Sequence, residues 1–131
     1  MLYLDSSAIV KLVSREPETA ALIRVVREDP SLISSALAWA EVVRAIHRAG
    51  GSTTRAERVL GGIGLVPIDD GIIRSAAALA PVTLRTLDAI HVATALSLGD
   101  DVSGLVTYDD RLASAAAEVG IGVISPGAAE P

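Results

Sequence analysis

The chain has 131 residues, half of them hydrophobic, with a net charge of −5 and no cysteine. This length predicts one domain with a substantial core, and the absence of thiols excludes disulfides, thiolate catalysis and cysteine-based zinc sites. No apolar run reaches the roughly 20 residues of a membrane span and no signal-type segment opens the sequence, so we expect a cytoplasmic protein that does not enter a membrane.

Short apolar segments alternate with helical segments along the chain, separated by Gly, Pro and capping residues. Strands are predicted at 2–5, 31–35, 65–68, 105–107 and 122–124, and helices at 6–14, 18–28, 36–49, 53–60, 70–81, 84–98 and 110–119. Pro67 places the third strand near an edge of the sheet, because proline has no N–H for a sheet ladder. The alternation is typical of an α/β fold with a short parallel central sheet flanked by helices.

No repeat or linker divides the sequence. We therefore predict a single domain over residues 1–125, followed by a disordered tail over residues 126–131.

Two acidic residues stand at predicted strand ends. Asp5 closes the first strand, and Asp109 follows the fourth. Because ligands of parallel α/β sheets bind outside the carboxyl ends of the strands, both carboxylates are expected in one crevice. The alternative for Asp5 is a helix N-cap; we expect Ser7 to serve as that cap instead.

Two more acids lie on helices in apolar company. Glu41 stands in ALAWAEVVRAIHRA and Asp88 in LRTLDAIHVATAL. A glutamate on a solvated face would usually have polar neighbours at helical spacing, whereas Glu41 has Leu37, Ala38 and Ala45. Asp88 is close enough to a helix start that a capping role stays open.

Four carboxylates cannot ionise together in a small volume without a compensating cation. With oxygen ligands and no cysteine, Mg²⁺ or Mn²⁺ is favoured over zinc. A carboxylate-bound Mg²⁺ suits hydrolysis of phosphodiesters, because it lowers the pKa of a bound water. Ser6 and Thr107 are candidates to contact the metal's waters. His91, three residues after Asp88, either faces this site or packs in the core, and His47 falls on a different helix face from Glu41.

Four segments in this order and spacing resemble the PIN-domain ribonucleases, and most closely the VapC toxins of bacterial toxin–antitoxin pairs: LYLDSSAIVKL, SSALAWAEVVRAI, LRTLDAIHVATAL and LVTYDDRLASAA. The resemblance spans about residues 2–124. It implies a PIN-like three-layer fold, an acidic pocket for Mg²⁺ or Mn²⁺, endonucleolytic cleavage of RNA and inhibition by a small antitoxin. The family's acids fall on Asp5, Glu41, Asp88 and Asp109, and its strand-end hydroxyl falls on Ser6. Thr107 matches a commonly polar position, and Asp110 either assists the site or caps the last helix.

RNA and protein partners follow from this resemblance and from charge. Arg44 and Arg48 follow Glu41 by three and seven residues, so with Lys11 they are predicted to hold RNA phosphates, the alternative being a solvated face. The acidic pocket would attract a basic antitoxin segment. The apolar composition favours a homodimer, with 17–28 and 55–60 as candidate interface helices.

Two other functions compete with the ribonuclease hypothesis. A phosphoacceptor signalling domain also uses strand-end acids and Mg²⁺, but it would add an acid beside Asp5 and a lysine after the last strand, and the only lysine is Lys11. A PIN-like scaffold without activity would have lost a carboxylate, whereas all four are present.

Overall fold

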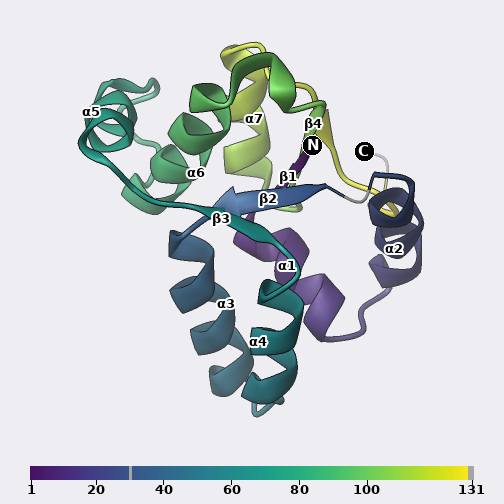
Figure 1. The fold of residues 1–131 in the computed structure, drawn as a ribbon. Coiled ribbons are helices and arrows are strands. Elements are labelled where there is room, and N and C mark those ends of the chain that lie inside the picture. Colours follow the sequence, from purple (N-terminus) through teal and green to yellow (C-terminus); the bar gives the residue numbers. More distant parts are fainter. Residues whose placement is uncertain (30, 130–131) are drawn as a thin grey trace.

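The computed structural model describes residues 1–29 and 31–129 as a five-stranded parallel sheet with helices on both faces (Figure 1). The strands are β1 (Leu2–Leu4), β2 (Leu32–Ser35), β3 (Gly64–Val66), β4 (Gly104–Val106) and β5 (Val123–Ile124). The helices are α1 (Ser6–Val13), α2 (Thr19–Glu28), α3 (Leu37–Arg48), α4 (Thr53–Leu60), α5 (Asp70–Ala78), α6 (Thr86–Ser97), the 3₁₀ turn η1 (Gly99–Asp101) and α7 (Asp110–Glu118).

The strand order β3-β2-β1-β4-β5 places β1 at the centre of the sheet. Leu2 pairs with both Leu32 and Gly104, so the first strand has a neighbour on each side. β3, which precedes Pro67, lies at an edge as predicted. Because the strands are parallel, β1 and β4 end side by side, and the residues after them share one edge of the sheet.

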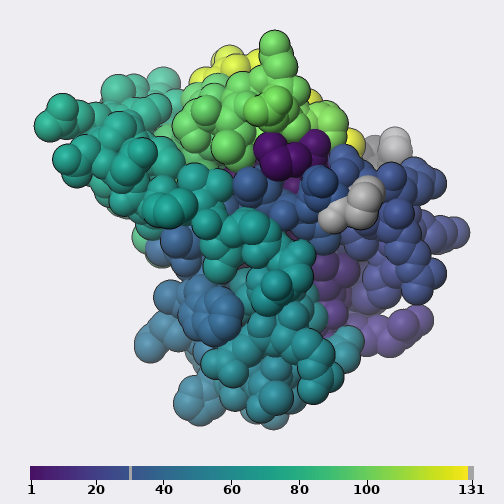
Figure 2. All heavy atoms as spheres, in the orientation of Figure 1, coloured from purple at the N-terminus to yellow at the C-terminus, as the bar shows by residue number. Residues whose placement is uncertain are grey.

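Alternating side chains of the central strands enter two separate cores. Leu4 and Val106 pack with α1, α2, α3 and α4 on one face of the sheet, whereas Tyr3 and Leu105 pack with α6 and α7 on the other. Figure 1 shows α3 and α4 on the side of the sheet opposite α6 and α7. Figure 2 shows that the α3–α4 pair, coloured blue to teal, projects from the body of the molecule.

Helix α6 is unusual because eight consecutive residues, from Asp88 to Ala95, are buried. It contacts α5, α7 and β2, so apolar partners surround it. A helix that is apolar on all sides belongs in a protein interior. Its few polar side chains, including Asp88 and His91, are thereby held inside the molecule.

The three-layer α/β architecture and the order of elements agree with the prediction, and most boundaries differ by one to three residues. No helix in the described residues is long and apolar enough to cross a membrane. Of the segment predicted as a disordered tail, residues 126–129 are described, and the Pro126 carbonyl accepts a hydrogen bond from Tyr108 at 2.7 Å. Residues 130 and 131 lie outside the described residues.

Candidate active site

Asp5 lies at the junction between β1 and α1, and its carboxylate is buried there. Its side chain is 3% exposed. Oδ1 accepts hydrogen bonds from the Ala8 N–H at 3.0 Å and the Ser7 hydroxyl at 2.7 Å, and Oδ2 accepts one from the Thr107 hydroxyl at 2.5 Å. Burial raises the pKa of Asp5, and these hydrogen bonds oppose the rise.

The prediction that Ser7 caps the first helix is wrong. Asp5 is itself the N-cap, because α1 begins at Ser6 and the Asp5 carboxylate reaches the free Ala8 N–H. Ser7 lies inside the first turn, where its hydroxyl donates to Asp5 and accepts from the Tyr108 N–H at 3.0 Å. The cap and the candidate metal ligand are thus the same residue.

Glu41 is held by donors from two other helices. The Ser6 hydroxyl donates to Oε1 at 2.5 Å, and Nε2 of His91 lies 2.7 Å from the same oxygen. His91 is 2% exposed, and its Nδ1 lies 2.8 Å from the Tyr3 hydroxyl. Burial raises the pKa of Glu41, but the hydrogen bonds from His91 and Ser6 outweigh it, so that the net shift is downward. His91 is therefore a core residue that also faces the site.

Asp88 and Asp109 are joined by one arginine. Arg85 Nε donates to Asp88 Oδ2 at 2.8 Å, and Arg85 Nη2 donates to Asp109 Oδ2 at 2.7 Å. These bonds, led by the one to Asp88, raise the pKa of the guanidinium. Arg85 is the residue before α6, so the capping alternative for Asp88 gives way to an ion pair at three-residue spacing.

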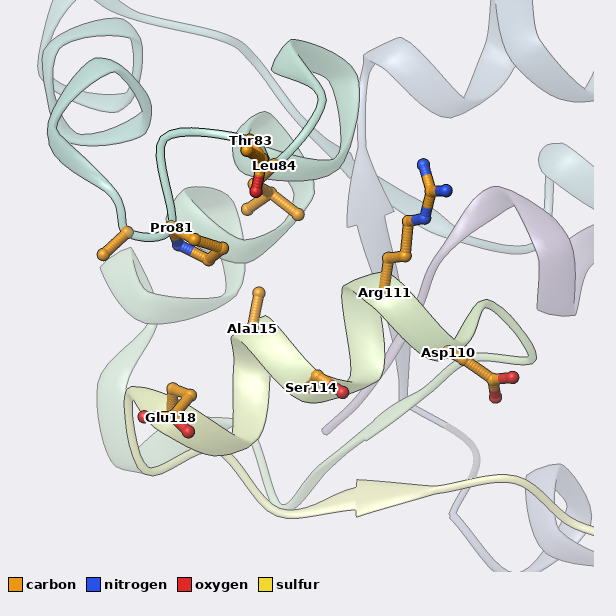
Figure 3. A pocket seen from close by; sticks show the side chains of 9 residues that line it. Pro81, Thr83, Leu84, Asp110, Arg111, Ser114, Ala115 and Glu118 are labelled. Atoms are coloured by element: carbon orange, nitrogen blue, oxygen red, sulfur yellow. The ribbon is translucent and has the colours of Figure 1, made fainter.

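Asp109 has a second role as the N-cap of α7. Its Oδ1 accepts the N–H groups of Arg111 at 2.9 Å and Leu112 at 3.1 Å. Of the two alternatives for Asp110, the capping role is wrong, because Asp110 is already the first residue of the helix. Asp110 instead lines a cavity of about 770 Å³ between α7 and the segment around Pro81 (Figure 3). In that view its carboxylate points away from Ala115 and Pro81.

The four predicted acids are therefore connected through shared neighbours near the carboxyl ends of β1 and β4. Thr107 connects two of them, since its Oγ1 donates to Asp5 and accepts from the Asp109 N–H at 3.0 Å. Glu41 joins through Ser6, the neighbour of Asp5, and the charge of Arg85 contributes to its lowered pKa. Each acid comes from a different segment of the chain.

Basic residues flank this cluster along α3. Arg44 and Arg48 are exposed and line a cavity of about 700 Å³ whose wall also includes Ser6, Glu41 and Lys11. Lys11 is already engaged, with Nζ 3.0 Å from Glu18, 3.5 Å from Glu16 and 4.8 Å from the centre of the Tyr108 ring. His47 lies apart from the acids, beside Arg44 and Arg48.

In the described residues, no three His, Asp or Glu side chains lie as a ready metal-binding group. Instead, Arg85 bonds to both Asp88 and Asp109, and hydroxyl groups donate to Asp5 and Glu41. The donor set nevertheless fits a hard divalent cation, because it consists of carboxylate and hydroxyl oxygens around a partly buried centre.

Sequence reasoning missed two contributors to this site. Arg85 stands three residues before Asp88, a helical spacing that suits an ion pair and that could have identified it. Tyr3 reads as an ordinary strand residue, and nothing in the sequence signals that its hydroxyl meets His91 across the sheet–helix interface.

Comparison with known proteins identifies the family. Residues 2–118 match the family model described as PIN domain. The ribonuclease VapC46 of Mycobacterium tuberculosis is 51% identical over 126 residues, covering 95% of this chain and 97% of the relative. This chain is a PIN-domain protein of the VapC ribonuclease family.

Solved structures share the fold of this chain. The crystal structure of Mycobacterium tuberculosis VapC20, described as a Sarcin-Ricin loop cleaving toxin, matches with a TM-score of 0.75 at 13% identity, covering 96% of this chain and all of the other. A toxin–antitoxin complex from Klebsiella pneumoniae matches with a TM-score of 0.73 at 22% identity, covering 96% and 98%. At these identities the likeness concerns the fold.

Proposed function

We propose that this VapC protein is the toxin of a toxin–antitoxin pair and that it cleaves RNA internally with Mg²⁺ or Mn²⁺ held by Asp5, Glu41, Asp88 and Asp109. The observation that carries the proposal is that these four acids come from four separate segments and are connected through Thr107, Arg85 and Ser6 near one edge of the sheet. A relative of 51% identity named a ribonuclease supports the reaction, and the oxygen-only donor set supports the metal.

A divalent cation bound there supplies a water of lowered pKa and neutralises charge on the phosphate. The residues of this chain orient the ligands. Thr107 and Ser7 fix both oxygens of Asp5, while Ser6 and His91 converge on Oε1 of Glu41. Ligands that are held by such outer hydrogen bonds bind metal more tightly than free side chains do.

The RNA backbone is proposed to run along α3. Arg44 and Arg48 line the same cavity as Glu41, and their guanidinium groups offer paired donors for phosphate oxygens. Lys11 contributes less in this arrangement, because Glu16 and Glu18 already balance its charge.

The test is cleavage of total cellular RNA by the purified chain with Mn²⁺ or Mg²⁺, with and without EDTA. We expect cleavage that EDTA abolishes and that Asp5→Asn or Asp109→Asn reduces by at least about 100-fold, since each removes a charged ligand. Asp100→Asn is the matched control: it makes the same change at an exposed residue of η1, which precedes β4 and so lies at the opposite edge of the sheet. Cleavage that persists in EDTA contradicts the metal mechanism.

The partner is proposed to be an antitoxin with a basic segment. Four carboxylates in a chain of net charge −5 favour an Arg or Lys side chain at the pocket, where it would compete with metal. We also expect a homodimer, with α2 and α4 as candidate interfaces. Light scattering of the chain alone, and co-purification with the small protein encoded beside it, test both; a strictly monomeric chain that retains no such protein would contradict them.

A further inference from the structure

Arg85 is a movable cation placed on the carboxylates that the proposed metal needs. Its side chain is 57% exposed, while those of Asp88 and Asp109 are 11% and 26% exposed. The guanidinium thus reaches from solvent onto two less accessible acids. An exposed arginine at the start of a helix can swing away without disturbing the core.

Arg85 is hydrogen-bonded to the same carboxylate oxygens that a metal would need as ligands. Asp109 Oδ1 already accepts two backbone N–H groups at the start of α7, so Oδ2 is the oxygen left to bind a cation, and Arg85 holds it. Asp88 Oδ2 is bonded to the same guanidinium. Metal ligation by both acids therefore requires that Arg85 leaves.

The charges around the four acids also favour replacement of Arg85 by a metal ion. Within the described residues, Arg85 and His91 are the side chains that form ion pairs with the four acids, and His91 is charged only when it is protonated. Arg85 thus supplies positive charge that a divalent cation would replace. Once displaced, its planar fork is free beside the site, where it matches the geometry of a phosphate.

We propose that Arg85 is a resident counter-ion of the acidic cluster which the metal displaces, and which then binds the phosphate of the RNA to be cleaved. This inference rests on the proposed metal-dependent ribonuclease activity. It assigns one side chain two successive partners: Asp88 and Asp109 without metal, and the substrate phosphate with metal.

Calorimetric titration with MnCl₂ and cleavage of a long end-labelled transcript at saturating Mn²⁺ test the proposal together. Arg85→Gln removes the competitor, so Mn²⁺ should bind about three- to tenfold more tightly. It also removes a charge-assisted contact to phosphate, so cleavage should slow by about 10- to 100-fold. A purely structural role for Arg85 would weaken both properties together.

Arg85→Lys keeps the charge without the fork, so we expect Mn²⁺ affinity near that of the wild type together with slower cleavage. Arg74→Gln is the matched control, because it makes the same charge change at an exposed residue of α5, a helix that contributes none of the four acids. We expect neither property to change in this control.

The possible outcomes separate the role of Arg85 from the proposed function. Unchanged or weaker Mn²⁺ binding by Arg85→Gln would overturn the exchange, and tighter binding with unchanged cleavage would overturn the phosphate contact. If the wild-type chain cleaves RNA and Arg85→Gln binds Mn²⁺ with the same affinity, the proposed function stands and this inference fails. A wild-type chain that binds no Mn²⁺ refutes the proposed metal mechanism itself.

Discussion

Thr107→Val tests how much the hydrogen bonds around the acids contribute, because it leaves all four carboxylates in place. Thr107 is fully buried just after β4, and its hydroxyl donates to Asp5 while it accepts the Asp109 N–H. Valine has nearly the same shape, so the change deletes both hydrogen bonds without opening a cavity. Asp5 then loses the donor to its Oδ2.

The expected cost follows from these two bonds. A hydrogen bond to a charged group contributes about 1.5–3 kcal/mol and is the larger of the two, so we expect a loss of about 2–3 kcal/mol in the free energy of unfolding. For a chain of this size that lowers Tm by roughly 6–12 °C. Because Thr107 orients a ligand from outside the metal's own shell, Mn²⁺ affinity should fall about 10- to 100-fold.

Thr19→Val is the matched control for this experiment. The Thr19 hydroxyl is also buried; it accepts the Glu16 N–H at 2.9 Å and donates to the Lys11 carbonyl at 2.8 Å. The control should lose about 1–2 kcal/mol of stability, since its acceptor is neutral, and keep its Mn²⁺ affinity. Urea denaturation and calorimetry measure the two effects; wild-type Mn²⁺ affinity in Thr107→Val would refute the reasoning.

Three further measurements probe the site. Burial raises the folded-state pKa of Asp5 above its ordinary value of 3.8. The stability that this shift contributes is therefore present below pH 3.8 and is lost as pH rises through the folded pKa. The change in unfolding free energy on Asp5→Asn should accordingly be more favourable at pH 7 than at pH 4 in urea denaturation, and an equal change at both would contradict this. Tyr3→Phe leaves Nδ1 of buried His91 without its donor, so we expect a loss of about 1–3 kcal/mol by the same assay, and an unchanged midpoint would argue against that bond. Replacing Arg44 and Arg48 together by Ala should make the salt dependence of RNA binding shallower by about 0.7–0.9 per lost phosphate contact, whereas an unchanged slope would assign both to a solvated face.

Local signals in the sequence were sufficient for the fold. Gly50 adopts φ +76° at the end of α3, a conformation that glycine tolerates, and the Gly50-Gly51 pair predicts that end. Pro67 predicts the edge position of β3. The continuous apolar character of 2–4 and 104–106 is typical of strands buried on both faces, and these are β1 and β4.

The sequence indicated which residues belong to the site more readily than it indicated how they are hydrogen-bonded. A strand-end acid can be a helix cap or a metal ligand, because both roles need an oxygen at the same place. From the sequence we assigned the ligand role to Asp5 and the cap to Ser7. The contact between Tyr3 and His91 joins residues 88 positions apart, and the angle at which α6 packs on the sheet decides it. Arg85 was visible at helical spacing from Asp88, but its second bond, to Asp109, depends on tertiary structure.

The double roles of Asp5 and Asp109 determine which substitutions give interpretable answers. Each carboxylate caps a helix through Oδ1, and each presents Oδ2 toward the neighbouring polar groups. Alanine at either position removes the cap, which costs about 1 kcal/mol, together with the charge, so a loss of activity would mix misfolding with lost metal binding. Asparagine caps a helix as well as aspartate does, so it keeps the helix start while it removes the charge and the acceptor that Oδ2 offers to Thr107 or Arg85. An inactive but stable Asn variant at both positions would therefore locate the chemistry in the carboxylate rather than in the helix caps.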